Sequence, residues 1–201
     1  MSPLAPVARA AAYAIVIAIL LELIVRTAGG GGGEAATAEN GPVEIGQCVA
    51  ALAAGGLFTL AARASAARAD LLYMLALASV FAGARELDRV FKHLVAEGAH
   101  KLVGVVIAIA AATIAWRARG RLIRQLEGFV RTAPAMLLFA ACVVILVFAQ
   151  IVGQQGLWRG LMGDGYIWQV KRAVEEISEL LGYLLLLFAA VETWLLERPD
   201  P

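Results

Sequence analysis

The sequence from Val170 to Glu197, VKRAVEEISELLGYLLLLFAAVETWLLE, decides the fold. Its apolar part, from Leu180 to Leu196, is interrupted only by Glu192 and a few small polar residues. A membrane-spanning helix needs about 20 mostly apolar residues, and this stretch supplies them in one run. Charged side chains lead into the apolar part: Lys171, Arg172, Glu175, Glu176 and Glu179. Because charges at membrane depth need partners, we expect this helix to meet charged groups of other helices.

The composition also indicates a membrane protein. The chain has 201 residues, of which 61% are hydrophobic, and its mean hydropathy is +0.79. Charged residues make up only 16% of the chain, against about 25% in soluble domains. A soluble helical bundle with a large core is the alternative, but several runs are apolar on all sides rather than along one stripe. The net charge of +1 gives no general attraction to nucleic acid.

The apolar runs predict an all-α fold, a polytopic membrane bundle that forms a single domain. Six spans are expected, at about 7–26, 47–62, 70–89, 101–116, 134–152 and 174–196. Residues 27–46 contain five consecutive glycines and several glutamates, which predicts a flexible acidic loop. A cleaved signal peptide is the alternative for the first run, but the length of this run and Glu22 within it favour a retained helix. The second run is rich in Ala and Gly, which favours close helix packing inside the monomer over a dimer face.

The distribution of arginine predicts the orientation. With six spans, both termini lie on one side of the membrane. The short turn with Arg63 and Arg68 and the basic segment 117–131 fall on that same side. The excess of basic residues in cytoplasmic loops therefore predicts that both termini are cytoplasmic. Fourteen arginines against three lysines, with abundant alanine, suggest a bacterial protein, and hence the inner membrane.

The basic segment 117–131 is expected to contact anionic lipids. Apolar residues alternate with its arginines at helical spacing, and Glu127 is its one acidic residue. Such an amphipathic segment is typical of a helix that lies on an anionic membrane face. The residues that would contact lipid are Arg117, Arg119, Arg121, Arg124 and Arg131. Nucleic-acid binding is the less favoured alternative, because basic loops are common in membrane proteins.

The predicted threading gathers charged residues in the outer third of the bilayer. The main candidates are Glu22, Arg26, Arg85, Glu86, Asp88, Arg89, Glu175, Glu176 and Glu179, with Lys92, Lys171, Arg172, Gln150 and Gln154 close by. Intramembrane charges usually face the bundle interior and form pairs, so Arg–carboxylate pairs should link the third and sixth spans, with the first span joining them. Glu22 and Arg26 can also pair with each other at i, i+4. Two interpretations stay open: a salt-bridge layer that fixes helix order, or an outward-facing pocket for an ion, a lipid headgroup or a small polar ligand.

A metal site is a sharper hypothesis for part of this region. On a continuous helix, one face would present Glu86, His93, Glu97 and His100. Residues 97–100 match the Glu-x-x-His spacing of carboxylate-bridged di-metal bundles, and the glutamates of the sixth span could add oxygen ligands. Only one such motif occurs, and both histidines also suit a hydrated interfacial segment. No cofactor is predicted beyond this less favoured metal ion.

Familiar catalytic motifs do not occur in the sequence. It contains no Gly-x-Ser-x-Gly, His-Glu-x-x-His, Cys-x-x-Cys or Walker motif. Its two cysteines, Cys48 and Cys142, fall at different membrane depths and are not expected to pair. The favoured function is a small transporter or binding protein with a charged pocket between the first, third and sixth spans. The alternatives are an accessory subunit of a larger complex, in contact with other subunits or a second copy, and a metal-dependent membrane enzyme.

Overall fold

The computed structural model describes residues 4–27, 30, 41–86 and 99–198, and none of these lies in a strand. The described elements are α1 (Ala5–Thr27), α3 (Pro42–Ala64), α4 (Ala69–Glu86), α6 (Ala99–Phe129), α7 (Ala133–Val143), the π-helix η2 (Val144–Phe148), α8 (Ala149–Val152), α9 (Gln155–Met162), the 3-10 turn η3 (Gly163–Gly165) and α10 (Trp168–Glu197). The prediction of an all-helical chain is confirmed for this part of the molecule.

Five helical stretches are long and apolar enough to cross a membrane: Ala5–Thr27, Pro42–Ala64, Lys101–Phe129, Ala133–Val152 and Trp168–Glu197. They support a multi-pass membrane protein that contacts lipid. The third predicted span corresponds to α4, which is not one of the five. Its 18 described residues include three charged ones near the helix ends, Asp70, Arg85 and Glu86.

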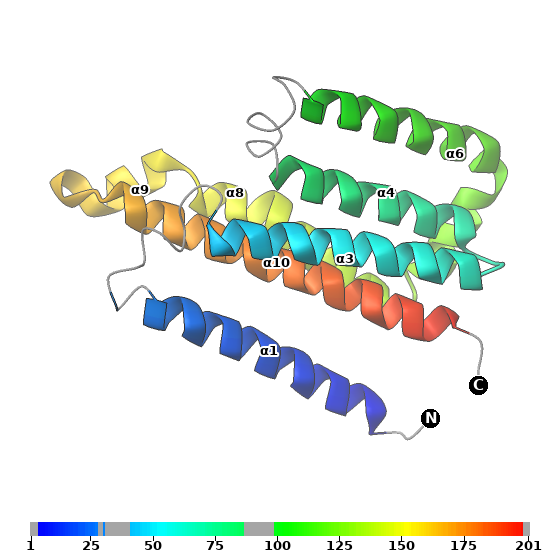
Figure 1. Ribbon diagram of the computed structural model, residues 1–201, viewed down its shortest axis with the longest axis horizontal. Helices are drawn as coiled ribbons and strands as arrows, with labels where there is room; N and C mark the ends of the chain where they lie inside the picture. Colours follow the sequence, from blue (N-terminus) through cyan, green and yellow to red (C-terminus); the bar gives the residue numbers. More distant parts are fainter. Residues whose placement is uncertain (1–3, 28–29, 31–40, 87–98, 199–201) are drawn as a thin grey trace.

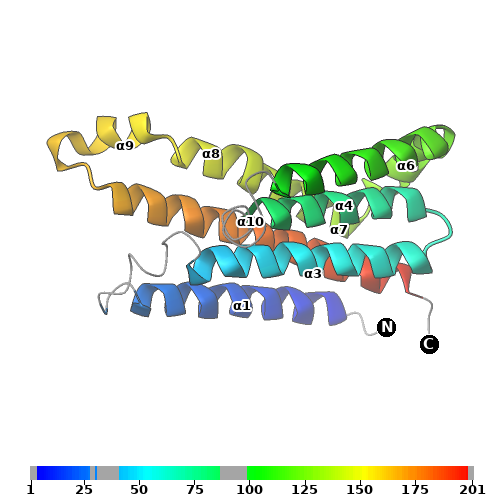
Figure 2. The same cartoon turned by 45° about the horizontal axis from the view of Figure 1, so that its top comes forward.

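The long helices run up and down in one bundle (Figure 1). Helix α3 packs on α4 and on α10, and α10 also packs on α7, η2 and α8. Helix α6 packs on α4, and α1 makes a smaller contact with α10. Figure 2 shows α9 above the start of α10, at the end of the bundle opposite the chain termini. The start of α1 and the end of α10 therefore lie at the same end of the molecule.

Small residues allow α3 and α4 to approach closely. A Cβ added to Gly55 would lie 2.8 Å from Val80 Cγ2, and one added to Gly83 would lie 3.1 Å from Leu52 Cδ2. Ala51 and Ala54 on α3 are fully buried in the same core. Close approach of membrane helices at small side chains gains van der Waals contact. The expectation that the small residues of α3 pack inside the monomer is therefore confirmed for Ala54 and Gly55.

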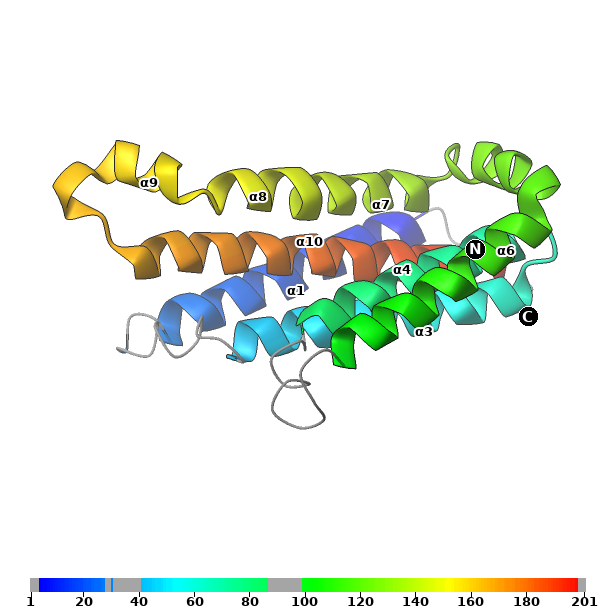
Figure 3. The same cartoon turned by 90° about the horizontal axis from the view of Figure 1, so that it is seen from above.

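Two element boundaries differ from the sequence-based expectations. Helix α3 begins at Pro42, so residues 42–46 are helical rather than part of the loop. Proline at the first helical position loses no hydrogen bond, and Glu44 in the first turn favours the helix dipole. Helix α6 continues to Phe129, so most of the basic segment belongs to the fourth predicted span. Figure 3 shows the last part of α6 turning across the end of the bundle, before α7 begins.

The fifth predicted span contains the π-helix Val144–Phe148. Gly182 of α10 packs against this π-helix. A Cβ added to Gly182 of α10 would lie 2.4 Å from Ile145 Cγ1 and 3.2 Å from Val144 Cγ1. Neither contact allows a methyl group without movement. Gly182 is therefore required by packing, since its backbone lies directly against the π-helix.

We expect Gly182→Ala to destabilise the bundle by about 1–3 kcal/mol, the usual cost of adding a methyl group to a packed core. The measurement is thermal unfolding of the purified protein in detergent. Gly56→Ala is the matched control, because a Cβ at Gly56 on α3 meets nothing within 4 Å. Equal midpoints for Gly182→Ala and the parent protein would contradict the packing described here.

Candidate functional site

A partly buried cluster of polar side chains joins the end of α4 to α10. Tyr183 on α10 is fully buried, and its hydroxyl donates a hydrogen bond of 2.7 Å to Glu86 Oε1. Arg85 Nη2 lies 2.9 Å from the same oxygen and 4.0 Å from Glu179 Oε1. One guanidinium is therefore shared by two carboxylates, and the four groups carry a net negative charge.

Glu179 is the less compensated of the two carboxylates. Only 12% of its side chain is exposed, and its nearest described cation is Arg85 at 4.0 Å. Gln150 of α8 adds one long contact, with Nε2 at 3.4 Å from Glu179 Oε1. A buried carboxylate without a close cation is costly in an apolar medium. Glu179 is thus suited to hold a proton or to attract a cation.

The other acidic residues near the start of α10 have closer partners. Lys171 Nζ contacts Glu175 one turn later, and Arg172 Nε lies 3.8 Å from Glu176 Oε1. The fully buried amide of Gln47 on α3 also donates to Glu176 Oε2 at 3.1 Å. Glu175 and Glu176 therefore each have a cation on α10 itself, and Glu176 also has a hydrogen-bond donor from α3. Glu179 has no such partner among the described residues of its own helix.

An apolar pocket of about 280 Å³ extends from this cluster. Leu75, Phe81 and Ala82 of α4 line one side of it. Leu138 and Cys142 of α7, with Ile145 of the π-helix, line the other side. Arg85 and Tyr183 belong to the lining as well, so the pocket combines a largely hydrocarbon wall with a polar end. This combination fits an amphipathic molecule better than a free ion.

The structure does not bring the predicted charges of the first span to this cluster. Glu22 and Arg26 form the expected i, i+4 pair at 2.8 Å, but their side chains are 58% and 77% exposed. The pair is therefore a local contact on the surface of α1. The sequence predicted a charged pocket between the first, third and sixth spans. Among the described residues, the charged side chains that come together belong to α4 and α10, with Gln150 of α8 beside them.

Helix α1 is instead attached to α10 by an ion pair that sequence reasoning missed. Arg9 Nε and Nη2 lie 2.6 Å and 2.9 Å from the two oxygens of Glu192. Tyr13 donates to Glu192 Oε1 at 2.8 Å and stacks on Phe188, with ring centroids 4.2 Å apart. The available signal was Glu192 itself, the one charge in the apolar body of α10, which requires a partner from another helix.

Part of the predicted charged layer and of the predicted metal site lies outside the described residues: Asp88, Arg89, Lys92, His93 and Glu97. His100 is in α6, but its side chain is not described. The metal hypothesis for Glu86, His93, Glu97 and His100 thus stays a prediction. Among the described residues, no three His, Cys, Asp or Glu side chains come together as metal ligands would. Cys48 and Cys142 are both free thiols, which confirms that they do not pair.

The predicted lipid-contacting arginines lie at the end of the bundle that carries the chain termini. Arg117 and Arg119 are exposed on α6, and Arg119 lies over the Trp116 ring at 4.8 Å. Arg131 is exposed in the turn before α7. Arg121 pairs with Asp70 of α4 at 3.0 Å, and Arg124 lines a pocket beside it.

No family model, curated protein or solved structure matches this chain. The chemistry of the side chains described above therefore has to indicate the function.

We expect Tyr183→Phe to destabilise the protein by about 1–3 kcal/mol, because Glu86 loses a buried hydrogen-bond donor. Thermal unfolding in detergent measures this loss. Tyr73→Phe on α4 is the control, since the Tyr73 side chain is partly exposed and its hydroxyl makes no described hydrogen bond. An equal change in the free energy of unfolding of both variants would contradict a specific contribution of the Tyr183–Glu86 hydrogen bond to stability.

We also expect strong coupling between Arg9 and Glu192. A double-mutant cycle with Arg9→Gln and Glu192→Gln should give about 1–3 kcal/mol, since the bidentate pair is only partly exposed and charge-assisted. The matched control is the exposed pair, with Glu22→Gln and Arg26→Gln, for which about 0.5 kcal/mol or less is expected. Unfolding midpoints provide the free energies. Similar coupling in the two cycles would mean that the ion pair is not what holds α1.

Proposed function

We propose that this chain is a small membrane transporter or binding protein whose ligand is an amphipathic cation. The observation that carries the proposal is Glu179, a nearly buried carboxylate whose described cation, Arg85, lies 4.0 Å away and also pairs with Glu86. Arg85 and Tyr183 of the same cluster line an apolar pocket. A positive group of the ligand would pair with Glu179, and its hydrocarbon part would lie along α4 and α7. Such sites are largely apolar with a few well-placed polar groups.

The same geometry supports a role for Glu86 and Tyr183 in positioning Arg85. Glu86 accepts a hydrogen bond from Tyr183 and an ion pair from Arg85, so its charge is already balanced. Arg85 is thereby held in the lining of the pocket, where a ligand cation would be repelled from it and directed to Glu179. A proton and the ligand would compete for the Glu179 carboxylate. Such competition is the simplest basis for proton-coupled transport.

The proposal includes six spans with both termini in the cytoplasm. The described part of α4 is about 27 Å long at 1.5 Å per residue, close to the thickness of the hydrocarbon core. It lies between α3 and α6, which both qualify as spans. Arg63, Arg68 and the arginines of α6 lie at the end of the bundle with the termini, which the positive-inside rule places in the cytoplasm. The Glu179 cluster would then face the outside, and a bacterial inner membrane would be the setting.

The test is binding of tetraphenylphosphonium, a lipophilic cation, to the purified full chain in lipid nanodiscs. Glu179→Gln should weaken binding at least about thirtyfold, the effect of removing one partner from a buried charge pair. Glu175→Gln is the control, because the Glu175 carboxylate has its own cation in Lys171, whereas Glu179 shares Arg85 with Glu86. Unchanged binding by Glu179→Gln would contradict the proposal. If Glu179→Gln unfolds the protein instead, the cluster is a structural salt-bridge layer.

An accessory-subunit role is the second candidate, and one observation favours it. Almost none of the apolar surface of α1 and α6 is buried within the chain, although both have membrane length. Another subunit could cover these helices as well as lipid does. Native mass spectrometry of the protein extracted from its own membrane separates the two roles. A co-purifying protein would support the subunit, whereas a single chain that retains a small cation would support the transporter.

A further inference from the structure

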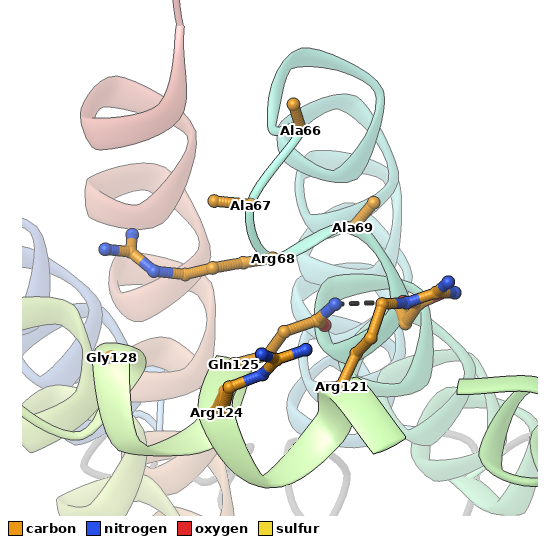
Figure 4. A pocket seen from close by; sticks show the side chains of 9 residues that line it. Ala66, Ala67, Arg68, Ala69, Arg121, Arg124, Gln125 and Gly128 are labelled. Atoms are coloured by element: carbon orange, nitrogen blue, oxygen red, sulfur yellow. Dashed lines mark hydrogen bonds and ion pairs between the residues drawn. The ribbon is translucent and has the colours of Figure 1, made fainter. Parts of the chain in front are cut away.

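A second pocket, with a polar lining, lies at the end of the bundle that carries the termini, far along the helices from Glu179. Figure 4 shows its lining residues from close by. Its volume is about 600 Å³. The turn 66–69 between α3 and α4 forms one wall, and the C-terminal half of α6 forms the other. Three arginines line it, Arg68, Arg121 and Arg124, together with the single acidic residue Asp70.

A buried amide holds this pocket in shape. Gln125 of α6 is 7% exposed, and its Oε1 accepts a hydrogen bond of 2.9 Å from the backbone N–H of Leu71. Its Nε2 donates to Asp70 Oδ2, also at 2.9 Å. Asp70 in turn pairs with Arg121 at 3.0 Å. The first turn of α4 and the wall of α6 are therefore fixed to each other by polar contacts rather than by loose surface packing.

The charges of the pocket are not balanced. Arg68 pairs with Glu197 of α10, and Arg121 pairs with Asp70. No described carboxylate pairs with Arg124, the third arginine. Figure 4 shows the Arg124 guanidinium beside the Gln125 side chain, which separates it from the Arg121 guanidinium, whereas Arg68 extends away toward α10. One unmatched positive charge thus remains on the exposed α6 wall of the pocket.

The position of the pocket matches the depth of lipid headgroups. It lies where α3 ends at Ala64 and α4 begins at Ala69, and both helices have about the length of the hydrocarbon core. Trp194 lies under Arg198 near the end of α10, and aromatic side chains of this kind are typical of the membrane interface. Guanidinium groups match the geometry of phosphate oxygens.

We propose that the pocket binds a phosphate group, with Arg124 as its central donor and Arg68 and Arg121 as flanking charges. A singly charged phosphate diester would balance the one unmatched cation. The phosphate can come from an anionic membrane lipid or from a soluble phosphate compound. The site is independent of Glu179 and of the ligand proposed for it.

The test compares lipids on the full chain by native mass spectrometry. The probes are dioleoylphosphatidylglycerol, dioleoylphosphatidylcholine, whose phosphate diester is offset by its choline cation, and inorganic phosphate as the soluble competitor. Arg124→Gln removes the central charge without breaking a described contact, so the fold should be retained. Arg117→Gln is the matched control: it removes the same charge from an exposed site on the same helix, outside the pocket lining.

We expect phosphatidylglycerol to be retained by the parent protein and by Arg117→Gln, and to bind about tenfold more weakly to Arg124→Gln. If millimolar inorganic phosphate does not displace it, the lipid is the ligand. If inorganic phosphate displaces it and itself binds with the same dependence on Arg124, the site takes a soluble phosphate. Equal retention of phosphatidylglycerol by Arg124→Gln, or an equal loss in Arg117→Gln, would overturn the proposal, because general surface charge would then explain the attraction.

Discussion

The cost of burying carboxylates on one membrane helix organises this bundle. Helix α10 carries acidic side chains at several depths, and different neighbouring helices contact Glu176, Glu179 and Glu192. Glu192 is held by α1 through Arg9, and Glu176 receives a hydrogen bond from Gln47 of α3. Glu179 meets α4 through Arg85 and α8 through Gln150. An unpaired charge is costly in hydrocarbon, so these contacts determine which helices pack beside α10. Apolar packing alone would distinguish weakly between alternative helix arrangements.

Close backbone approach makes those polar contacts geometrically feasible. Gly55 and Gly83 bring α3 and α4 together, and Gly182 lets α10 lie against the π-helix. The π-helix begins just before Ile145, beside the apolar pocket and about one helical turn before Gln150. Non-α turns of this kind occur often at functional sites. Packing by small residues and pairing of buried charges thus work on the same helix, at adjacent turns.

Local patterns in the sequence predicted the features that depend on neighbouring residues. Runs of apolar residues indicated the helices, and the spacing of Glu22 and Arg26 indicated their ion pair. Contacts between distant residues left weaker signals: Arg9 and Glu192 are 183 positions apart, and only their isolation in apolar surroundings marked them. The hydrogen bond from Tyr183 to Glu86 and the π-helix depend on helix rotation, which composition does not specify. The continuation of α6 through its arginines differs from the expectation that the fourth span ends at residue 116, because charged residues alone do not end a helix and no proline interrupts this one.

The contact between α1 and α10 has a consequence for biosynthesis. Arg9 belongs to the first described helix, and its acceptor Glu192 belongs to the last. During synthesis from the N-terminus, α1 therefore enters the membrane well before its partner exists. Until then the arginine has to reach the headgroup layer, which its long side chain near the start of α1 permits. Docking of the first helix is thus delayed until the final one is inserted, so this ion pair closes the bundle late in assembly.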